Sequence, residues 1–329
     1  MLKAVLNVAP RRAISAVIAA LGAALGAGAT AAAYPARLIT FVVPFTAGAG
    51  PDVFVRAIAQ EVAKAAGVPA IVENRPGAGS ALAAQTVAKA RPDGYTVLVT
   101  GNVAFTGNPY TLKKLAYDPV ADFTPVTTLA KGPMYLYTNP QKLPVANIAE
   151  LLQLIRKNPG KYSFGYTSIT SRLPAEVLQQ SMGLKILGVP YRSGAAAVPD
   201  LVGGQIDMMF TDFAPWPHVA SGKLRAMAVT DPKRSPYAPK LPTFDESGVK
   251  GMNIGFWLAA YLPAGASAQV AEQLQGLLAK AVRTSGVKSV YQATGTFEFV
   301  VPGAEMAKFQ ANESAAWGRI IRAAGIQPE

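Results

Sequence analysis

Two loops rich in small residues contain groups that could hold an anion. Residues 45–48 lie between an apolar run that reads as a strand, 38–43, and a helix that begins at Pro51. Residues 77–80 follow a second short strand and precede a second helix. Small side chains let backbone N–H groups converge on a ligand, and a helix N-terminus adds partial positive charge. The two loops, over residues 44–52 and 74–80, are therefore suited to a carboxylate or a phosphate.

Each of these loops on its own is equally consistent with an ordinary tight turn, in which glycine only relieves steric strain. The presence of two such loops favours a function, because both could grip one anionic group. Neither loop matches the phosphate-binding pattern Gly-x-x-x-x-Gly-Lys-Ser/Thr or the dinucleotide pattern Gly-x-Gly-x-x-Gly. A nucleotide ligand is therefore disfavoured.

A second group of polar side chains follows strands in the middle of the chain. Arg172, in the hydroxyl-rich turn 168–172, could pair in a bidentate manner with a carboxylate, although a solvated arginine at a helix start is also common. Tyr191 and Arg192 place a ring and a cation in another strand-to-helix turn. Asp212 could bind an amine or a hydroxyl, or simply cap the next helix. The candidates in this group are Ser168, Thr170, Ser171, Arg172, Tyr191, Arg192 and Asp212.

Most catalytic, metal and cofactor chemistry lacks the residues that it needs. The chain has no cysteine and a single histidine, His218, which excludes thiolate chemistry and multi-histidine metal sites. No Gly-x-Ser-x-Gly elbow occurs, and we interpret His218 as structural because no recognisable catalytic motif surrounds it. The 31 lysines and arginines outnumber the 19 acids but are dispersed, whereas nucleic-acid binding needs a focused basic stripe. We expect no enzyme activity, metal, cofactor or nucleic-acid partner.

The first 33 residues have the pattern of a secretory signal peptide. Basic residues within positions 1–12 precede an alanine-rich apolar run, 13–25, and small residues follow it. The run is shorter and richer in glycine than the roughly 20 apolar residues of a membrane-spanning helix. An anchor that is never removed is the alternative. We expect cleavage after Ala31 or Ala33 and an exported mature protein.

The elements that position the candidate groups alternate between strand and helix. Short apolar runs and helical patterns follow one another along the mature chain, which predicts an α/β fold. Two extended segments, 134–138 and 253–262, are predicted to cross between two α/β lobes. Ligands in such folds bind at the carboxyl ends of strands. We expect one lobe from residues 34–133 and 256–329, the other from residues 134–255, and the ligand cleft between them.

Local signals also predict several boundaries. A helix should begin at Pro51 and end at Gly67, and Asn147 with Glu150 forms the capping box of a second helix. Three further expectations concern an irregular stretch, a helix and a strand, over residues 101–125, 267–284 and 297–301.

On these residues the chain resembles the Bug family, the extracytoplasmic solute receptors of tripartite tricarboxylate transporters. The most specific strings are Glu-Asn-Arg-Pro-Gly-Ala-Gly at 73–79 and Arg-Pro-Asp-Gly-Tyr-Thr at 91–96. The resemblance covers essentially the whole mature chain. It implies a type II periplasmic binding-protein fold, in which two lobes joined by two crossover strands close over a small carboxylate-bearing solute. The matching segments are 39–45, 47–48, 52, 72–79, 88–96, 189–192, 201–207 and 222–230.

The resemblance also implies roles and partners. Family members hold a ligand carboxylate through the first two loops, largely by backbone N–H groups and ordered waters. Carried over to this sequence, that implies contacts from Phe45, Thr46, Ala47, Gly48, Gly77, Ala78, Gly79 and Ser80. The second lobe would bind the rest of the solute through residues 168–172, 191–192 and Asp212. The partner would be the membrane permease of a tripartite tricarboxylate transporter, and the receptor would be a periplasmic monomer.

Two departures from the family pattern bear on the solute. The first loop has less glycine and proline than is usual, and Arg172 falls near an expected histidine. A contact from Arg172 would favour a second anionic group, so a dicarboxylate that also faces Arg192 is the first expectation. An aromatic acid held between Phe45, Phe213 and Trp216 is the second. The alternative functions are a receptor for a membrane sensor kinase and a secreted hydrolase, which would need an activated nucleophile.

Overall fold

The computed structural model describes residues 34–328. Its contacts divide the chain into Met1–Ala36 and one compact unit, Arg37–Glu329, which holds every helix and strand named below. The predicted signal peptide, residues 1–33, lies outside the described residues. Within the described part, no helix combines the length and the apolar character that crossing a bilayer requires.

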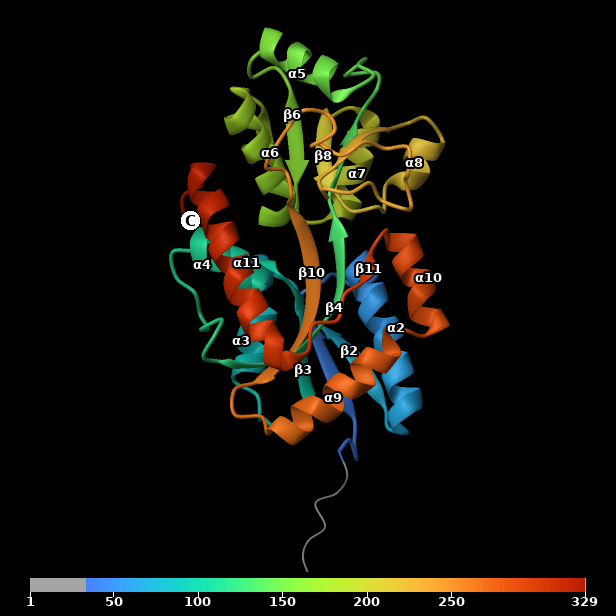
Figure 1. Ribbon diagram of the computed structural model, residues 1–329, viewed down its shortest axis with the longest axis vertical. Helices are drawn as coiled ribbons and strands as arrows, with labels where there is room; N and C mark the ends of the chain where they lie inside the picture. The colour runs from blue at the N-terminus through green and yellow to red at the C-terminus, as the bar shows by residue number, and fades with distance from the viewer. Residues whose placement is uncertain (1–33, 329) are drawn as a thin grey trace, which may run out of the picture. The chain divides into compact units, whose positions relative to one another are not determined.

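Six strands form the first sheet (Figure 1). In sheet order they are β11 (Phe297–Glu298), β4 (Phe123–Pro133), β10 (Gly255–Pro263), β3 (Thr96–Gly101), β1 (Ile39–Val43) and β2 (Ala70–Asn74). β1 pairs in parallel with β2 and β3, whereas β10 pairs antiparallel to β3 and β4. The carboxyl ends of β1 and β2 therefore meet at one edge, where both candidate loops begin.

Amphipathic helices cover the first sheet. α2 (Gly50–Ala66) buries Phe54, Ile58 and Val62 and ends at Gly67, whose left-handed backbone (φ 68°) closes the helix. The predicted start at Pro51 and stop at Gly67 are confirmed to within a residue. The other helical elements of this part are α3 (Ala81–Ala88), the π-helical turn η2 (Val103–Gly107), α4 (Asn108–Thr111), α9 (Ala268–Ala281), α10 (Ser285–Thr294) and α11 (Gly303–Ala323).

Five strands form the second sheet. In sheet order they are β7 (Leu187–Pro190), β6 (Ser163–Tyr166), β8 (Met208–Thr211), β5 (Tyr135–Thr138) and β9 (Arg225–Val229). β6 is parallel to β7 and β8, and β5 is antiparallel to β8 and β9. The helices of this part are α5 (Ile148–Lys157), α6 (Ile169–Met182), α7 (Gly194–Gly203) and α8 (Trp216–Ala220).

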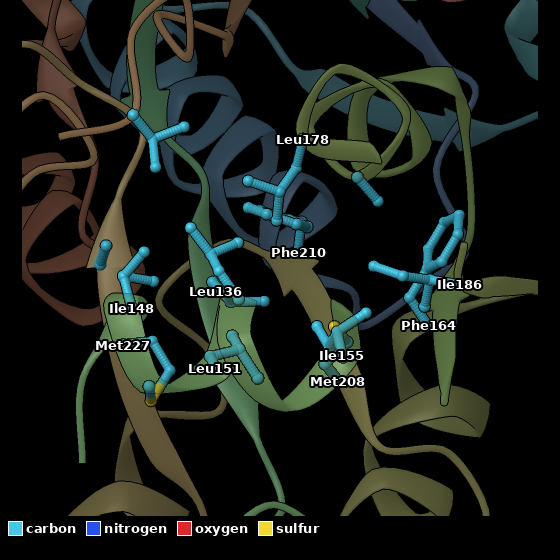
Figure 2. Close-up of a cluster of buried hydrophobic side chains, with 14 of the residues drawn as sticks. Leu136, Ile148, Leu151, Ile155, Phe164, Leu178, Ile186, Met208, Phe210 and Met227 are labelled. Carbon is cyan, nitrogen blue, oxygen red and sulfur yellow. The ribbon is translucent and has the colours of Figure 1, made fainter. Parts of the chain in front are cut away.

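The core of the second sheet is shown in Figure 2. Leu151 and Ile155 of α5 are fully buried and belong to one apolar cluster with Leu136 of β5. The helix begins with the predicted capping box, since the Glu150 N–H donates to Asn147 Oδ1 at 2.9 Å. The Glu150 carboxylate in turn accepts from the backbone just before Asn147. The capping box therefore fixes where α5 begins, and the buried side chains fix which face of the helix packs on the sheet.

The chain passes between the two sheets twice. β4 continues into β5 through Met134, and the segment after β9 returns to β10 through Ile254. Thr230 joins these two connections, because its hydroxyl accepts from Met134 N at 2.9 Å and donates to Ile254 O at 2.6 Å. Each sheet with its helices makes an α/β lobe, lobe 1 around the first sheet and lobe 2 around the second, as predicted for the fold class. The boundaries 34–133 with 256–329, and 134–255, stay a prediction.

Two local predictions were wrong because the elements are more numerous than the patterns suggested. Residues 101–125 are not irregular, since they contain η2, α4 and the start of β4. The helix predicted over 267–284 ends at Ala281, and α10 begins separately behind Thr284. Thr284 caps α10 by accepting from Val287 N at 3.4 Å, so its hydroxyl starts a new helix where we expected an end.

The strand predicted over 297–301 was too long. β11 pairs with β4 only through Phe297 and Glu298. Beyond it, Phe299 O accepts from the Thr128 hydroxyl at 2.7 Å, and Val301 N donates to the same hydroxyl at 2.7 Å. Side-chain bonds of Thr128 therefore continue the pairing beyond Glu298, beside a backbone bond from Thr128 N to Val301 O at 3.3 Å, and a pattern of alternating apolar residues cannot reveal such side-chain bonds.

Candidate functional site

The first candidate loop is fixed by a buried carboxylate. Asp52, in the first turn of α2, is fully buried. Its Oδ2 accepts from Gly48 N at 2.8 Å and from Arg56 Nε at 2.9 Å, and its Oδ1 accepts from Asn74 Nδ2 at 2.6 Å. Asn74 also donates to Phe45 O at 2.9 Å. These bonds tie the end of β2 to residues 45–48, so the two candidate loops are held as one unit.

The charge of Asp52 is set by the same contacts. Burial alone would raise the pKa of its carboxyl, but hydrogen bonds from Arg56, Asn74 and Gly48 outweigh burial and lower the pKa below 3.8. The ionised carboxylate is therefore the stable form at neutral pH. The sequence showed Asp52 only as part of a family motif. An acid in the first turn of a helix was the signal for its role.

Two backbone donors of the first loop remain free. Within residues 34–328, the N–H groups of Thr46 and Ala47 make no hydrogen bond, and both residues are exposed. The Gly48 N–H, by contrast, is used by Asp52, and Gly48 supplies a left-handed turn (φ 80°). The free donors stand just ahead of the α2 N-terminus, where an anion is favoured.

The second candidate loop contains four successive residues with positive φ. The angles are 132° at Gly77, 46° at Ala78, 57° at Gly79 and 77° at Ser80, and η1 (Ala78–Ser80) lies within this run. Ala78 and Ser80 carry a Cβ, so each costs on the order of 1–3 kcal/mol of backbone strain. Such strain persists where the surroundings enforce a conformation, and it often marks a ligand site.

Asn108 provides the enforcing contact for the second loop. Its side-chain Nδ2 donates to Gly79 O at 2.8 Å and to the Tyr117 hydroxyl at 3.1 Å. Tyr117 in turn donates to Ala104 O at 2.6 Å. Asn108 and Tyr117 are both buried. Sequence analysis missed both residues, because they lie in the stretch that it treated as irregular.

The neighbouring glycine of that stretch brings lobe 2 to the second loop. A Cβ on Gly107 would lie 2.7 Å from Ile169 Cγ2, so the start of α6 packs directly against η2. Gly107 precedes Asn108, which holds Gly79. The start of α6 and residues 77–80 therefore both contact the segment of η2 and α4, and the site itself stays a prediction.

Within that turn the hydroxyl groups serve the helix start. Ser171 is buried, and its Oγ accepts from Thr167 N at 2.9 Å and from Ser168 N at 3.2 Å. Thr170 is buried as well. Arg172 Nε donates to Glu176 Oε1 at 2.9 Å on the same helix. The turn thus presents a rigid helix N-terminus, with an arginine held beside it by its own helix.

Tyr191 and Arg192 differ in their surroundings. The Tyr191 hydroxyl donates to Asp200 Oδ2 at 2.8 Å. Burial and this neighbouring carboxylate raise the pKa of Tyr191 to about 12, so the phenol stays protonated at physiological pH. Its ring lies 3.4 Å from the position of a Cβ on Gly165. Arg192, by contrast, is exposed.

Asp212 faces the start of α2. Its Oδ2 lies 3.8 Å from the position of a Cβ on Gly50, and its Oδ1 accepts from Ala214 N at 3.1 Å. Burial raises the pKa of Asp212 above its ordinary value. Both residues line a space of about 10 Å³, together with Pro51 and Phe256, which has room for no more than about one water. Lobe 2 therefore approaches the first loop through Asp212.

The aromatic residues suggested for a ring ligand do not form a sandwich. Phe213 and Trp216 stack on each other with centroids 4.6 Å apart and planes 16° apart. Phe213 is buried in the lobe 2 core and also packs against Tyr135 and Tyr237. Because each ring covers a face of the other, no ligand ring lies between Phe213 and Trp216, and an aromatic solute stays a prediction. Phe45 is half-buried at the end of β1.

Comparison with known proteins gives this geometry a context. The model of the tripartite tricarboxylate transporter family receptor matches residues 54–326. The chain belongs to this family. Protein BugT of Bordetella pertussis is 30% identical to it over 298 residues, which cover 89% of this chain and 91% of that protein. The predicted Bug-type resemblance is therefore confirmed, and the family is one of solute-binding receptors.

Solved structures of similar proteins share the whole fold of this receptor. Periplasmic binding protein BugD is 30% identical, with a TM-score of 0.82 over 90% of this chain and 100% of that chain. R. palustris Rpa4515 with adipate is 29% identical, with a TM-score of 0.84 and the same coverage. MatC from Rhodopseudomonas palustris with bound malate is 28% identical, with a TM-score of 0.77 over 88% and 100%. The predicted periplasmic binding-protein fold is confirmed.

Proposed function

We propose that this receptor binds a small dicarboxylate between its lobes in the periplasm and delivers it to the permease of a tripartite tricarboxylate transporter. The observation that carries the proposal is the pair of free N–H groups on Thr46 and Ala47, ahead of the α2 N-terminus. Such donors suit a carboxylate. Two family neighbours are solved with adipate and malate, and both of these anions carry two carboxylates.

The proposed binding sequence begins on lobe 1. Residues 45–48 and 77–80 take the first carboxylate on backbone donors that the Asp52 and Asn108 networks hold in place. Closure then brings up the lobe 2 group, Ser168, Thr170, Ser171, Arg172, Tyr191, Arg192 and Asp212. Arg172 or Arg192 meets the second carboxylate. Asp212 contacts a hydroxyl or an amine on the solute.

The remaining assignments follow from this role. Residues 1–33 act as the export signal, and the mature chain works as a monomer that binds its solute without converting it. Residues 34–133 with 256–329 move as one lobe against residues 134–255. Presentation of the closed lobes to a membrane sensor kinase is the alternative to delivery to a permease. Uptake of labelled solute decides between them, measured in cells that lack this gene but express the transporter from a separate promoter. Loss of uptake supports delivery to the permease, whereas intact uptake supports the sensor role.

Calorimetric titration of the mature chain tests the binding. The protein is unfolded and refolded first, so that no solute from the cell is retained. Adipate, malate and succinate are compared with hexanoate, which keeps the chain of adipate but lacks one carboxylate. We expect at least one dicarboxylate to bind about a hundredfold more tightly than hexanoate, since a charge-assisted bidentate pair is lost in the monoacid. The proposal would be refuted if none of the three dicarboxylates bound more tightly than hexanoate.

A further inference from the structure

The two crossover strands line a second cavity, apart from the candidate site. Its volume is about 300 Å³, at the lower end of the range for small-molecule pockets. The residues of the candidate loops, 45–48 and 77–80, take no part in it. It is bounded by the end of β4, the start of β10, the segment around β11, and α11. In Figure 1, α11 and β11 lie on either side of β4 and β10. We call this space the hinge cavity.

Several aromatic rings line the hinge cavity. β10 contributes Trp257, α11 contributes Phe309 and Trp317, and Phe299 follows β11. Phe309 stands edge-on to Trp257 and to Phe299, with centroids 5.4 and 5.3 Å apart. Aromatic faces attract cations through their quadrupole.

The charged groups of the hinge cavity are two acids and one base. Glu313, half-buried on α11, accepts from Trp257 Nε1 through Oε2 at 3.2 Å. Its Oε1 has no hydrogen-bond partner within the described residues. Asp231 is the second acid and Lys131 the base. The ammonium of Lys131 lies 4.8 Å from the centroid of the Phe299 ring, and no described carboxylate pairs with it within 4 Å. The Lys131 ammonium thus already makes a cation–π contact with Phe299 at the edge of the cavity.

Burial raises the pKa of Glu313, although the bond from Trp257 and the charge of Lys131 oppose the shift. A half-buried carboxylate in this situation gains from a cation placed against its open oxygen. Two acids against one base give the cavity an excess of negative charge, which disfavours an anionic ligand. The aromatic walls, the excess of negative charge and the open Oε1 of Glu313 therefore all favour a cationic ligand.

We propose that the hinge cavity binds a small organic ammonium ion with an apolar body. The ammonium group donates to Glu313 Oε1, and the body packs among Trp257, Phe309 and Trp317. This site is separate from the proposed dicarboxylate site, has the opposite charge preference, and can be tested without any solute of the receptor.

Tryptophan fluorescence reports on this cavity directly. Two of the three tryptophans of the chain, Trp257 and Trp317, line it, while Trp216 stacks on Phe213 in lobe 2. The mature chain is titrated with 2-phenylethylammonium, with its neutral isostere 2-phenylethanol, and with the anion 3-phenylpropanoate. We expect saturable quenching by the ammonium ion, with an affinity about tenfold above that of the alcohol and no saturation by the anion.

Two cavity variants are expected to change the affinity in opposite directions. Misfolding could only weaken binding, so a gain in affinity in one variant cannot result from a folding defect. Glu313→Gln keeps an acceptor for Trp257 and should weaken ammonium binding about tenfold. Lys131→Gln removes a like charge from the wall and should strengthen binding by a few-fold. Glu305→Gln, on the exposed face of the same helix, serves as the matched control and should change nothing. Equal binding of the alcohol and the ammonium ion, preference for the anion, or an unchanged affinity in both cavity variants would overturn the proposal.

Discussion

Gly132 and Gly255 lie in contact where the two crossover strands pass each other. A Cβ on Gly255 would be 2.7 Å from the carbonyl oxygen of Gly132, closer than real Cβ atoms approach. On the other side, a Cβ on Gly132 would be 2.9 Å from the ring of Phe256. The strands therefore need glycine at position 255, because a side chain there would meet the backbone of β4, whereas a Cβ at position 132 would meet the Phe256 ring. This contact therefore bears on stability and, under the proposed closure of the lobes, on movement as well.

Gly255→Ala should lower the stability of the chain by about 1–3 kcal/mol, because the methyl group forces the strands apart. Urea unfolding of the mature protein measures the change. Gly276→Ala is the matched control, since Gly276 lies exposed within α9 with nothing near its Cβ position. That variant should gain about 0.5–1 kcal/mol from helix propensity. A Gly255→Ala protein as stable as the parent would contradict the close approach.

Thr230→Val should destabilise the hinge by about 1–3 kcal/mol. The valine keeps the shape but removes the hydroxyl, so the Met134 N–H loses its side-chain acceptor and Ile254 O loses its donor. Thr230→Ser retains both bonds and should recover most of the loss. Hydrogen exchange at the Met134 amide would report the same change locally. Slow exchange in the valine variant, equal to that of the parent, would show that the hydroxyl does not hold the connection.

Asp52→Asn should remove an acid-sensitive part of the stability. The pKa of Asp52 in the folded chain lies below its ordinary value, which is the value in the unfolded chain. At a pH between the folded and the unfolded pKa, the unfolded state therefore binds more protons than the folded state. This contribution is therefore complete above the unfolded pKa and is lost as the pH falls toward the folded pKa. We expect Asp52→Asn to lose about 1–3 kcal/mol at neutral pH and to show a flatter acid limb in unfolding measured against pH. An acid limb as steep as that of the parent would contradict this role of Asp52.

Gly79→Ala should weaken dicarboxylate binding about tenfold or more while the fold persists. Its Cβ would lie 3.2 Å from Asn108 Oδ1, in a backbone with φ 57°, so the loop must shift away from the carboxylate position. Gly183→Ala is the control, because Gly183 has a similar φ of 64° but open space around its Cβ position. Calorimetry of both variants separates backbone strain from loop displacement. An unchanged affinity in Gly79→Ala would remove residues 77–80 from the site.

The elements with strong local signals could be predicted from the sequence. α2 follows from Pro51 at its start and Gly67 at its end, and the capping pair Asn147 and Glu150 marks α5. Each of these signals acts within one turn of helix, so neighbouring residues carry all the information. The positions of both candidate loops, at strand-to-helix junctions, follow from the same short-range patterns.

Partners that lie far apart in the chain could not be predicted in this way. Asn74 bonds to Asp52, Asn108 holds Gly79, and the hydroxyl of Thr230 joins residues 96 positions before it and 24 positions after it. No periodicity encodes such pairs, because they arise only when packing of the sheets and helices brings the groups together. The sequence thus determined which residue types surround the site. The tertiary structure decided which of their hydrogen-bonding groups are used within the protein and which stay free for a ligand, since a polar group that finds an internal partner is no longer available to a solute.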